Sequence, residues 1–429
     1  MNKETAFKYL ITEFHEFKLP IIKNRHYILP ETEKIISIVG VRRSGKTFFL
    51  YQIIKNLLSK GVPKKCIVYI NFEDDRLFSL NIEDMNDLIE AYYSLYPSTK
   101  DLKKYFFFDE IQVIENWEKF IRRLDDKENI KLILTGSSSK LTSQEIATSL
   151  RGRTLSIQFY PLNFLEYLNF FDIKVPKNFK YSEVRHKIRN LFEKYIYEGG
   201  FPEIITTNNL KSEILRSYYN LIFYRDLVER YNLRNFIALR HLMSYLLTNI
   251  GNAFSFNAYF RIINQQIRIS KDTLLEYFGY LQEIQFVFSV KLFSFSVKQQ
   301  QANPVKIYCI DNGLRNNAVF KFSKDEGRLV ENIVFLTLKR NFSKVFYWKG
   351  KNEVDFVVPL SMKEVQLINV CYDDEIPMRE YKGFNEFKKK FPSLKCKMLI
   401  LTKNLDDSSK EILKIPVWEW ILSEIMRKS

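Results

Sequence analysis

The feature that most constrains this chain is a glycine-rich octapeptide, GVRRSGKT at residues 40–47, which fits the pattern G-x-x-x-x-G-K-[ST] in full. The run KIISIVG at residues 34–40 is apolar and β-branched, which predicts a buried strand ending in the octapeptide. Residues 46–60 have apolar side chains at helical spacing and stop before Gly61. A strand, a glycine-rich loop and a helix in this order indicate an α/β layer with a mostly parallel sheet.

The octapeptide has the chemistry of a phosphate-binding loop. Its glycines allow backbone conformations that turn successive N–H groups toward phosphates, and the N-terminus of the next helix adds its positive dipole end. Lys46 is expected to reach the β- and γ-phosphates, and the Thr47 hydroxyl to bind Mg²⁺. We therefore expect ATP and Mg²⁺ as cofactors. The predicted nucleotide-binding residues are Gly40, Val41, Arg42, Arg43, Ser44, Gly45, Lys46 and Thr47.

An acidic pair closes a second apolar run, YFFF at residues 105–108. A carboxylate at the end of a parallel strand, beside the strand of the phosphate-binding loop, is placed to hold Mg²⁺, and this role is predicted for Asp109. Glu110 is predicted to polarise the water that attacks the γ-phosphate. The alternative is an acidic pair that only ends a buried strand.

Two further catalytic candidates follow. Ser137, in TGSSS at residues 135–139, stands just past an apolar run and is predicted to contact the γ-phosphate or the attacking water. An ordinary serine-rich turn has the same pattern. Arg153, in RGR at residues 151–153, is predicted to act as an arginine finger in trans, although a solvated surface arginine is an equal alternative.

Two rival classes of nucleotide-binding protein fit less well. A GTPase needs N/T-K-x-D to read guanine, and TKNL at residues 402–405 has Leu in place of Asp. A small-molecule kinase rarely carries the more than 250 further residues present here. The long remainder of the chain favours an ATPase that works as a motor or a switch.

Composition limits which binding partners and which cellular compartment we expect. The formal net charge of +16 raises the prospect of DNA or RNA, but basic and acidic residues alternate, so a lysine-rich solvated surface remains the alternative. The N-terminal residues lack a signal-peptide pattern, and no window of about 18 uncharged apolar residues occurs, so we expect a cytoplasmic protein with no membrane segment. The four cysteines are scattered, which disfavours disulfides and zinc.

The pattern along the chain predicts four parts in an α/β protein. Residues 1–160 are expected to form the P-loop domain, with strands separated by helices, and residues 161–215 a helical lid. Residues 216–312 contain two helical segments followed by alternating runs, which favours a winged helix-turn-helix. Residues 313–429 mix helices and strands and are expected to form a small separate α/β domain.

Taken together, the motifs resemble those of prokaryotic AAA-type ATPases that join an ATPase domain to a domain of unknown function numbered 4143. The pieces that carry the resemblance are VGVRRSGKT (39–47), YINFED (69–74), FFDEIQ (107–112), LTGSSS (134–139), RGRT (151–154), YPL (160–162), GGFPE (199–203), YRD (224–226), YCIDNG (308–313), EN (331–332) and EVDF (353–356). The resemblance implies ATP hydrolysis, a winged-helix middle and a restriction-endonuclease-like C-terminal fold.

The nuclease-like end lacks part of the expected metal site. Such a nuclease needs a helix Glu, a strand Asp and then Glu-x-Lys, since two carboxylates hold the metal and the Lys orients water. Glu331 and Asp355 fit the first two positions, but EVQ at residues 364–366 and NVC at residues 369–371 do not supply the third. We therefore expect a structural or nucleic-acid-docking domain rather than an active nuclease.

Three hypotheses follow for the whole chain. The first is a Mg²⁺-dependent ATPase whose nucleotide cycle changes its conformation, with DNA as one target. Arg261, Arg268 and Lys271 are placed to contact phosphates or base edges near the recognition helix, with a winged helix that only packs within the protein as the equal alternative. The second is a slow, nucleotide-gated switch that docks DNA or an unknown protein partner. The third, disfavoured above, is an ATP-dependent nuclease. A homo-oligomer is left open, because a trans arginine finger requires a neighbouring copy.

Overall fold

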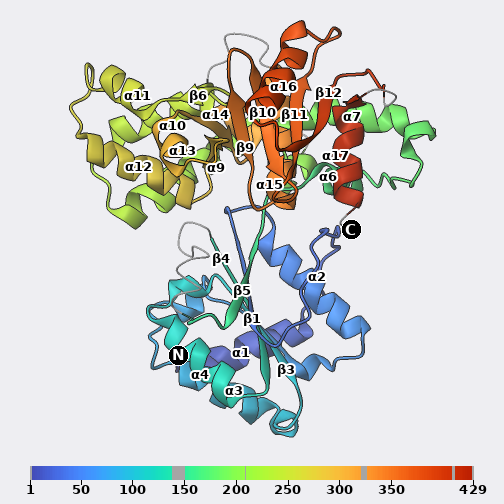
Figure 1. Cartoon of the computed structure of the whole chain (residues 1–429). Helices are drawn as coiled ribbons and strands as arrows, with labels where there is room; N and C mark the ends of the chain where they lie inside the picture. The colour runs from blue at the N-terminus through green and yellow to red at the C-terminus, as the bar shows by residue number, and fades with distance from the viewer. Residues whose placement is uncertain (1, 138–149, 208, 320–325, 408–410, 428–429) are drawn as a thin grey trace. The chain divides into compact units, whose positions relative to one another are not determined.

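The computed structural model describes residues 2–137, 150–207, 209–319, 326–407 and 411–427. The chain forms two compact units, Met1–Tyr160 and Pro161–Ser429 (Figure 1). The predicted α/β fold class is confirmed, because a parallel sheet flanked by helices is followed by a second, mixed sheet.

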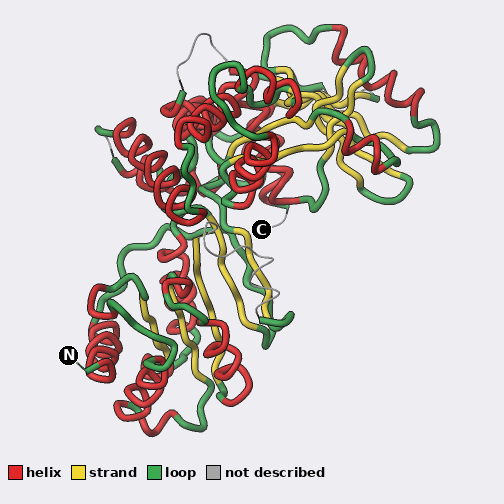
Figure 2. Tube along the Cα trace, turned by 90° about the vertical axis from the view of Figure 1, so that its left-hand side faces the viewer, coloured by secondary structure: helices red, strands yellow, loops and turns green. Residues whose placement is uncertain are grey.

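The first unit is built on a five-stranded parallel sheet in the order β2-β3-β4-β1-β5, with helices on both of its faces (Figure 2). Its strands are β1 (Ile35–Gly40), β2 (Ile67–Asn71), β3 (Lys104–Asp109), β4 (Ile130–Ser137) and β5 (Thr154–Gln158). Its helices are α1 (Lys3–Glu16), α2 (Lys46–Ser59), α3 (Met85–Leu95) and α4 (Trp117–Lys127).

The alternation of side chains along a strand explains why helices cover both faces of this sheet. Along β3, Phe106 and Phe108 pack into the core shared with α1, α3 and α4, whereas Phe107 between them packs into the core shared with α2. All three rings are fully buried. Because successive side chains of a strand point to opposite faces, an uninterrupted apolar run needs an apolar partner on each side.

One expectation about this sheet is wrong. The strand that ends in Asp109 was expected beside the strand of the phosphate-binding loop, but β4 lies between β3 and β1. Local sequence patterns do not encode the order of strands, because each crossover helix can return the chain to a neighbouring or a more distant position. The consequence is that β4 contributes side chains to the space between the two motifs.

The second unit contains a mixed eight-stranded sheet in the order β13-β12-β11-β10-β9-β7-β8-β6. Its strands are β6 (Ala253–Phe254), β7 (Val287–Leu292), β8 (Val305–Cys309), β9 (Phe346–Lys349), β10 (Glu353–Pro359), β11 (Glu364–Cys371), β12 (Lys395–Thr402) and β13 (Ile412–Pro416). Its helices are α6 (Phe164–Phe170), α7 (Arg185–Glu198), α8 (Pro202–Thr206), α9 (Lys211–Leu221), α10 (Phe236–Thr248), α11 (Phe256–Ile263), α12 (Lys271–Glu283), α13 (Val297–Ala302), α14 (Asn312–Ala318), α15 (Glu326–Asn341), α16 (Met378–Lys390) and α17 (Val417–Met426), and π-helical residues Ile222–Glu229 continue α9.

This sheet joins regions that the sequence pattern had separated. Strand β6 precedes α11, whereas β7 and β8 follow α12, and β8 pairs with both of the other strands. Strand β7 also pairs in parallel with β9 through Lys291 and Leu292. The boundaries predicted at 215/216 and 312/313 fall inside α9 and α14. A change of pattern along the chain marks new elements, but it does not show that later strands will extend the same sheet.

Two of the short motifs meet inside the second unit. An Asp311 side-chain oxygen accepts hydrogen bonds from the backbone N–H of Gly200 at 2.6 Å, and the other oxygen accepts one from Leu314 N–H at 2.9 Å. A Cβ added at Gly199 would lie 2.2 Å from Asp311 Oδ1, and one added at Gly313 would lie 2.0 Å from the Glu198 carbonyl oxygen. The GGFPE and YCIDNG motifs therefore serve packing, since only glycine leaves room for this approach.

Among the described residues, no helix is both long and apolar enough to cross a bilayer.

Candidate nucleotide-binding site

The phosphate-binding loop connects β1 to α2 and has the backbone that the glycines predict. Gly45 has a φ of 93° and Arg43 a φ of 64°, so both lie in the left-handed region. A Cβ at Gly40 would lie 2.0 Å from the Phe159 carbonyl oxygen, which explains the glycine at the end of β1. The Ser44 hydroxyl donates to the Val41 carbonyl oxygen at 2.8 Å and closes the turn.

Lys46 is turned back over the loop. Its ammonium donates to the carbonyl oxygens of Gly40 at 3.1 Å and Val41 at 3.3 Å, and it lies 3.6 Å from Glu110 Oε1. Lys46 is only 5% exposed. These contacts keep the ammonium at the mouth of the loop, where a phosphate would meet it.

Asp109 is surrounded by hydroxyl groups. Its Oδ2 accepts hydrogen bonds from Thr47 Oγ1 at 2.7 Å and Tyr69 OH at 3.0 Å, and its Oδ1 accepts one from Thr135 Oγ1. Burial raises the pKa of the Asp109 carboxyl, although these hydroxyl donors lower it. A carboxylate and a hydroxyl placed this close together are the oxygen ligands that Mg²⁺ prefers.

Glu110 has a strained backbone and a different electrostatic environment. Its φ of 53° is rare for a residue with a side chain, and strain of this kind concentrates at functional sites. Burial acts to raise the pKa of Glu110, but the charges of Lys46 and Arg42 hold it below its usual value. Gln112 Nε2 also donates to Glu110 Oε2. The Glu110 carboxyl group is therefore paired with Lys46 and Gln112 in this structure.

The two further catalytic candidates lie at opposite ends of the sheet. Ser137 is buried and is the register partner of Gly40 in the β1–β4 pair, which puts it beside the start of the loop. Ser138 and Ser139 lie outside the described residues. Arg153 stands at the amino end of β5, where its guanidinium pairs with Asp126 and lies 3.7 Å from Asp125. Because β1 is parallel to β5, about 17 Å of strand separates that end from the loop, so Arg153 does not serve the site of its own chain.

Sequence reasoning missed two side chains that shape this site. Thr135 lies on β4 between the motifs, and its hydroxyl also accepts a hydrogen bond from Glu110 N–H at 3.1 Å. Arg25 is buried behind the loop and donates to the carbonyl oxygens of Ser44 at 2.8 Å and Tyr160 at 2.7 Å. The apolar run containing Thr135 signals a strand, but no local pattern marks Arg25, because it lies in an irregular segment.

Comparison with known proteins decides the family. Residues 32–168 match the model of an AAA domain, residues 189–326 that of a domain of unknown function, DUF8612, and residues 326–420 that of a domain of unknown function, DUF4143. Over 99% of its length and 96% of the relative, the chain is 37% identical to the uncharacterized protein MJ1544 of Methanocaldococcus jannaschii. The chain belongs to this family of AAA and DUF4143 proteins. An uncharacterized protein of Haemophilus influenzae is 30% identical over 83% of this chain and 86% of the relative.

The chain is also similar to solved structures at low identity and low TM-score. The Aeropyrum pernix ORC1 protein, determined in complex with DNA, is 11% identical with a TM-score of 0.27, over 74% of this chain and 91% of that one. AMPPCP-bound DnaA from Aquifex aeolicus is 13% identical with a TM-score of 0.25, over 66% of this chain and 88% of that one. The matches to the AAA and DUF4143 family models, and not these structures, confirm the resemblance to AAA-type proteins joined to domain 4143.

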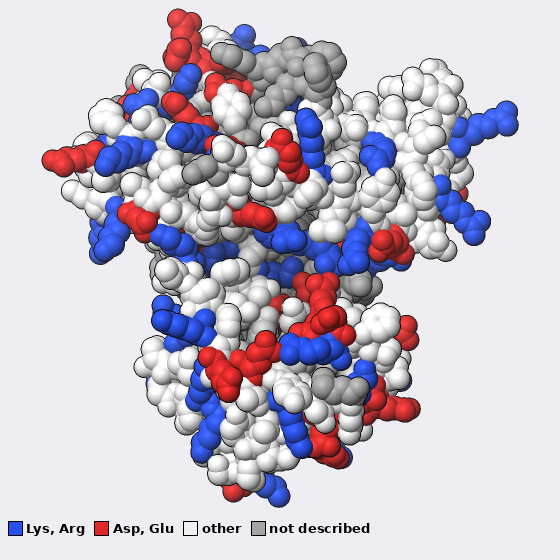
Figure 3. All heavy atoms as spheres, turned by 180° about the vertical axis from the view of Figure 1, so that it is seen from behind, with Lys and Arg blue, Asp and Glu red and all other residues white. Residues whose placement is uncertain are grey.

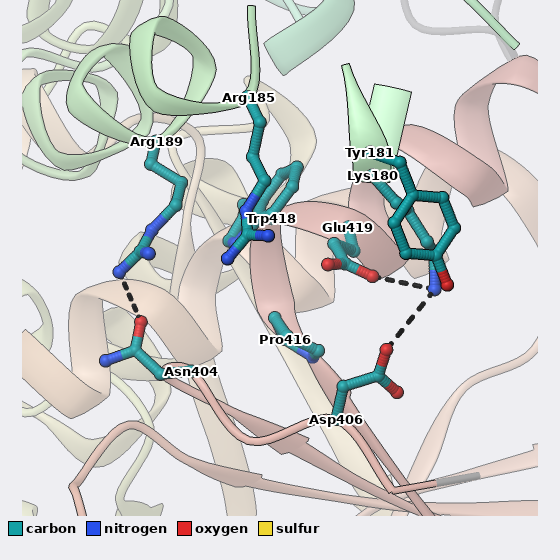
Figure 4. A pocket seen from close by; sticks show the side chains of 9 residues that line it. All are labelled: Lys180, Tyr181, Arg185, Arg189, Asn404, Asp406, Pro416, Trp418 and Glu419. Carbon is teal, nitrogen blue, oxygen red and sulfur yellow. Dashed lines mark hydrogen bonds and ion pairs between the residues drawn. The ribbon is translucent and has the colours of Figure 1, made fainter. Parts of the chain in front are cut away.

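A hollow in the second unit is too small to be a second nucleotide site. It has a volume of about 110 Å³, well below the roughly 300–1,000 Å³ of small-molecule pockets (Figure 4). Its acidic groups are already paired, since Lys180 lies 2.7 Å from Glu419 and 3.9 Å from Asp406. The residues that line it are Lys180, Tyr181, Arg185, Arg189, Asn404, Asp406, Pro416, Trp418 and Glu419.

Proposed function

We propose that this chain is a Mg²⁺-dependent ATPase whose nucleotide cycle drives a conformational change. The observation that carries the proposal is the convergence of Lys46, Thr47, Asp109 and Glu110 at the carboxyl ends of β1 and β3. A loop that presents N–H groups, one ammonium, a hydroxyl beside a carboxylate, and a second carboxylate are together the groups that phosphoryl transfer to water requires.

The proposed roles follow from the positions of these groups. The loop N–H groups and Lys46 bind the phosphates, and Thr47 with Asp109 holds Mg²⁺, which would neutralise charge on the phosphate oxygens. Glu110 orients and polarises the attacking water, while Ser137 contacts the γ-phosphate. Thr135 is a positioning residue, because it fixes both the Asp109 side chain and the Glu110 backbone.

The contact between Lys46 and Glu110 suggests how nucleotide readies the site. While Lys46 lies 3.6 Å from Glu110, the lysine helps keep the pKa of that carboxyl low, and a low pKa makes a weak base. A bound γ-phosphate competes for the ammonium and lessens this pairing. The Glu110 carboxylate then becomes a stronger base at the moment that its substrate arrives.

The primary test compares nucleotide binding and steady-state hydrolysis in three proteins. Lys46→Ala is expected to lose ATP binding at least tenfold, along with turnover. Lys55→Ala, an exposed lysine of the same helix α2, is the matched control and should behave as the parent. ATP and GTP are tested side by side. Retained hydrolysis by Lys46→Ala would overturn the assignment of the site.

A slow nucleotide-gated docking switch is the second candidate function, and the paired state of Glu110 favours it. On this proposal the chain binds Mg²⁺-ATP and hydrolyses it slowly, if at all. Turnover that stays slow with and without DNA, together with tight ATP binding, would support the switch. A fast basal rate would reject it.

A surface for nucleic acid is proposed at α11 and α12. The side chains of Arg261, Arg268 and Lys271 are all exposed there. The core contacts of α12 are made by other side chains, among them Leu274 and Tyr277, which are buried. The order α10, β6, α11, α12, β7, α13, β8 is that expected of a winged helix-turn-helix, with the short helix α13 added between its last two strands. On the face that Figure 3 shows, basic and acidic side chains lie among one another over much of the surface.

DNA binding by Arg268→Ala/Lys271→Ala tests this surface. The double variant is expected to bind DNA more weakly and to reduce the slope of log K against log salt by about two, one for each lost phosphate contact. Lys389→Ala/Lys390→Ala removes the same charge from the exposed end of α16 and should change little. Equal effects of the two double variants would indicate only nonspecific attraction.

The arginine finger in trans remains a proposal that needs a homo-oligomer. Mixing Lys46→Ala with Arg153→Ala tests it, because one of the two mixed arrangements joins the intact loop of one subunit to the intact arginine of the other. Partial recovery of ATPase activity in the mixture would support a shared site. A monomeric parent with full activity would exclude it.

A further inference from the structure

Lys306, on β8, is a buried cation with three carboxylates around it. Its ammonium lies 2.6 Å from Glu353, 2.9 Å from Asp355 and 3.0 Å from Glu331. The residue is only 1% exposed. Burying an unpaired ammonium costs several kcal/mol, so the carboxylates of β10 and α15 are what make this position tolerable.

The two acids predicted for a nuclease-like metal site belong to this cluster. Glu331 and Asp355 do converge, but Glu331 Oε1 and Asp355 Oδ1 both accept hydrogen bonds from Lys306. Glu331 Oε1 also accepts one from Tyr308 OH at 2.6 Å. The second oxygen of Asp355 accepts one from Val370 N–H at 2.9 Å.

The remaining donors do not complete a metal site. The backbone N–H of Asp355 donates to the side chain of Asn369 at 3.0 Å, so an amide stands on β11 where such a nuclease has an acid. Glu364, at the far end of β11, pairs instead with Lys397 at 3.2 Å. In the part of the chain that the structure describes, no group of three or more His, Cys, Asp or Glu is placed to hold a metal ion. The residues present do not fit a divalent cation.

We infer that Lys306 is the resident cation of this cluster, filling the place that a divalent ion takes in a metal-dependent nuclease and fastening β8 to α15 and β10. The carboxylates here hold structure together and do not cleave nucleic acid. Because β8 follows α11 and α12 while α15 and β10 belong to the C-terminal region, the cluster joins these two regions of the second unit.

The electrostatics of the cluster agree with a permanent ammonium. Burial alone would lower the pKa of Lys306, but Asp355, Glu331, Tyr308 and Glu353 hold it well above its usual value. Three carboxylates nevertheless outnumber one ammonium, and part of the excess is relieved by Lys349, which lies 3.2 Å from Glu353. Removing the ammonium alone would leave a concentrated negative charge that a divalent cation could neutralise.

Mn²⁺ titration of the full chain without nucleotide tests the inference. The parent and Asp355→Asn are expected to bind Mn²⁺ equally, because the cluster of the parent has no vacancy. Lys306→Ala should gain one site, at least tenfold tighter than any in the parent, and Lys306→Ala/Asp355→Asn should lose it. Lys349→Ala removes an exposed lysine of the same neighbourhood and should gain no comparable site.

Two results would overturn the inference. One is a Mn²⁺ site in the parent that Asp355→Asn abolishes, and the other is Mn²⁺-dependent DNA cleavage by the parent that the same substitution abolishes. A folded Lys306→Ala variant that gains no site would also count against it. Should that variant fail to fold, the comparison of the parent with Asp355→Asn still decides.

Discussion

The two units each pair a lysine with carboxylates, and the difference between the pairs is instructive. In the first unit Lys46 contacts two carbonyl oxygens and lies 3.6 Å from one carboxylate, at the mouth of a loop. In the second unit Lys306 is enclosed by three carboxylates within 3.0 Å. A loosely paired ammonium can exchange its partners for a phosphate, whereas a saturated one has nothing to gain from a ligand.

The largest effect that would sharpen this comparison is expected from Glu110→Gln. If Glu110 is the base that acts on water, the variant should bind Mg²⁺-ATP as the parent does and hydrolyse it about 10²–10⁴-fold more slowly. ATP binding and single-turnover hydrolysis, measured together, check this. Glu115→Gln, in the turn that follows, is a matched control. An unchanged hydrolysis rate would remove Glu110 from the mechanism.

Lys306→Ala should destabilise the second unit by about 3–5 kcal/mol, because it leaves three partly buried carboxylates without their cation. Denaturant unfolding, followed by a probe in the second unit, measures the loss. Lys349→Ala, which breaks an exposed pair with Glu353, should cost about 1 kcal/mol or less. If both variants cost the same, Lys306 is not the centre of the cluster.

Asp311 sharpens the comparison because it is a buried carboxylate without a lysine at hydrogen-bond distance. Its hydrogen-bond donors are instead backbone N–H groups. Burial raises the pKa of Asp311 to about 6, although the N–H groups of Gly200 and Leu314 lower it. Since the folded pKa lies above the unfolded one, this contribution to stability is complete below about pH 4 and is lost as the pH rises through 6. A pKa difference of about two units between the folded and unfolded states changes the free energy of unfolding by at most about 3 kcal/mol.

Unfolding midpoints measured from pH 4 to pH 8 test the behaviour of Asp311. The parent should become less stable across this range, and Asp311→Asn should flatten the dependence in part. Glu331, whose pKa is also raised by burial, still contributes in both proteins. Asp374→Asn, at an exposed position, should leave the slope unchanged. An equally steep slope in Asp311→Asn would contradict the assignment.

The smallest effect is expected from Thr135→Val, which keeps the shape of the side chain but removes its hydroxyl. Losing the hydrogen bonds to Asp109 and from Glu110 N–H should cost about 1–2 kcal/mol, or roughly tenfold in Mg²⁺-ATP turnover. Steady-state rates across a range of Mg²⁺ concentrations check this. Thr135→Ser, which restores the hydroxyl, should recover most of the activity; failure to do so would show that the methyl group matters more.

Much of the fold could be predicted because local patterns reported it. The helix Lys46–Ser59 occurs where apolar spacing and Gly61 placed it, and the strand Ile35–Gly40 follows from a largely β-branched apolar run. The last strand, β13, and the helix α17 that directly follows it were not predicted. In that segment, VWEWIL at residues 417–422 is buried almost throughout, so it shows no polar face to reveal its period.

The residues of the candidate site also divide into those that could be predicted from the sequence and those that could not. The loop residues and the acidic pair were predictable, since phosphate and Mg²⁺ chemistry demands particular residue types at fixed spacing. Arg25, Thr135 and Lys306 were not, because each forms hydrogen bonds with residues at least 19 positions away, and Lys306 looked like one lysine among many.

The sequence by itself determined the strand–loop–helix unit, its phosphate-binding residues and the family of the chain, because these depend on neighbours along the backbone. Only the tertiary structure decided that β4 separates the two motifs, and that a lysine from β8 enters the cluster of Glu331 and Asp355. The reason is physical: strand order and the pairing of buried charges arise from long-range burial, in which each group is stabilised by partners that the local sequence does not specify.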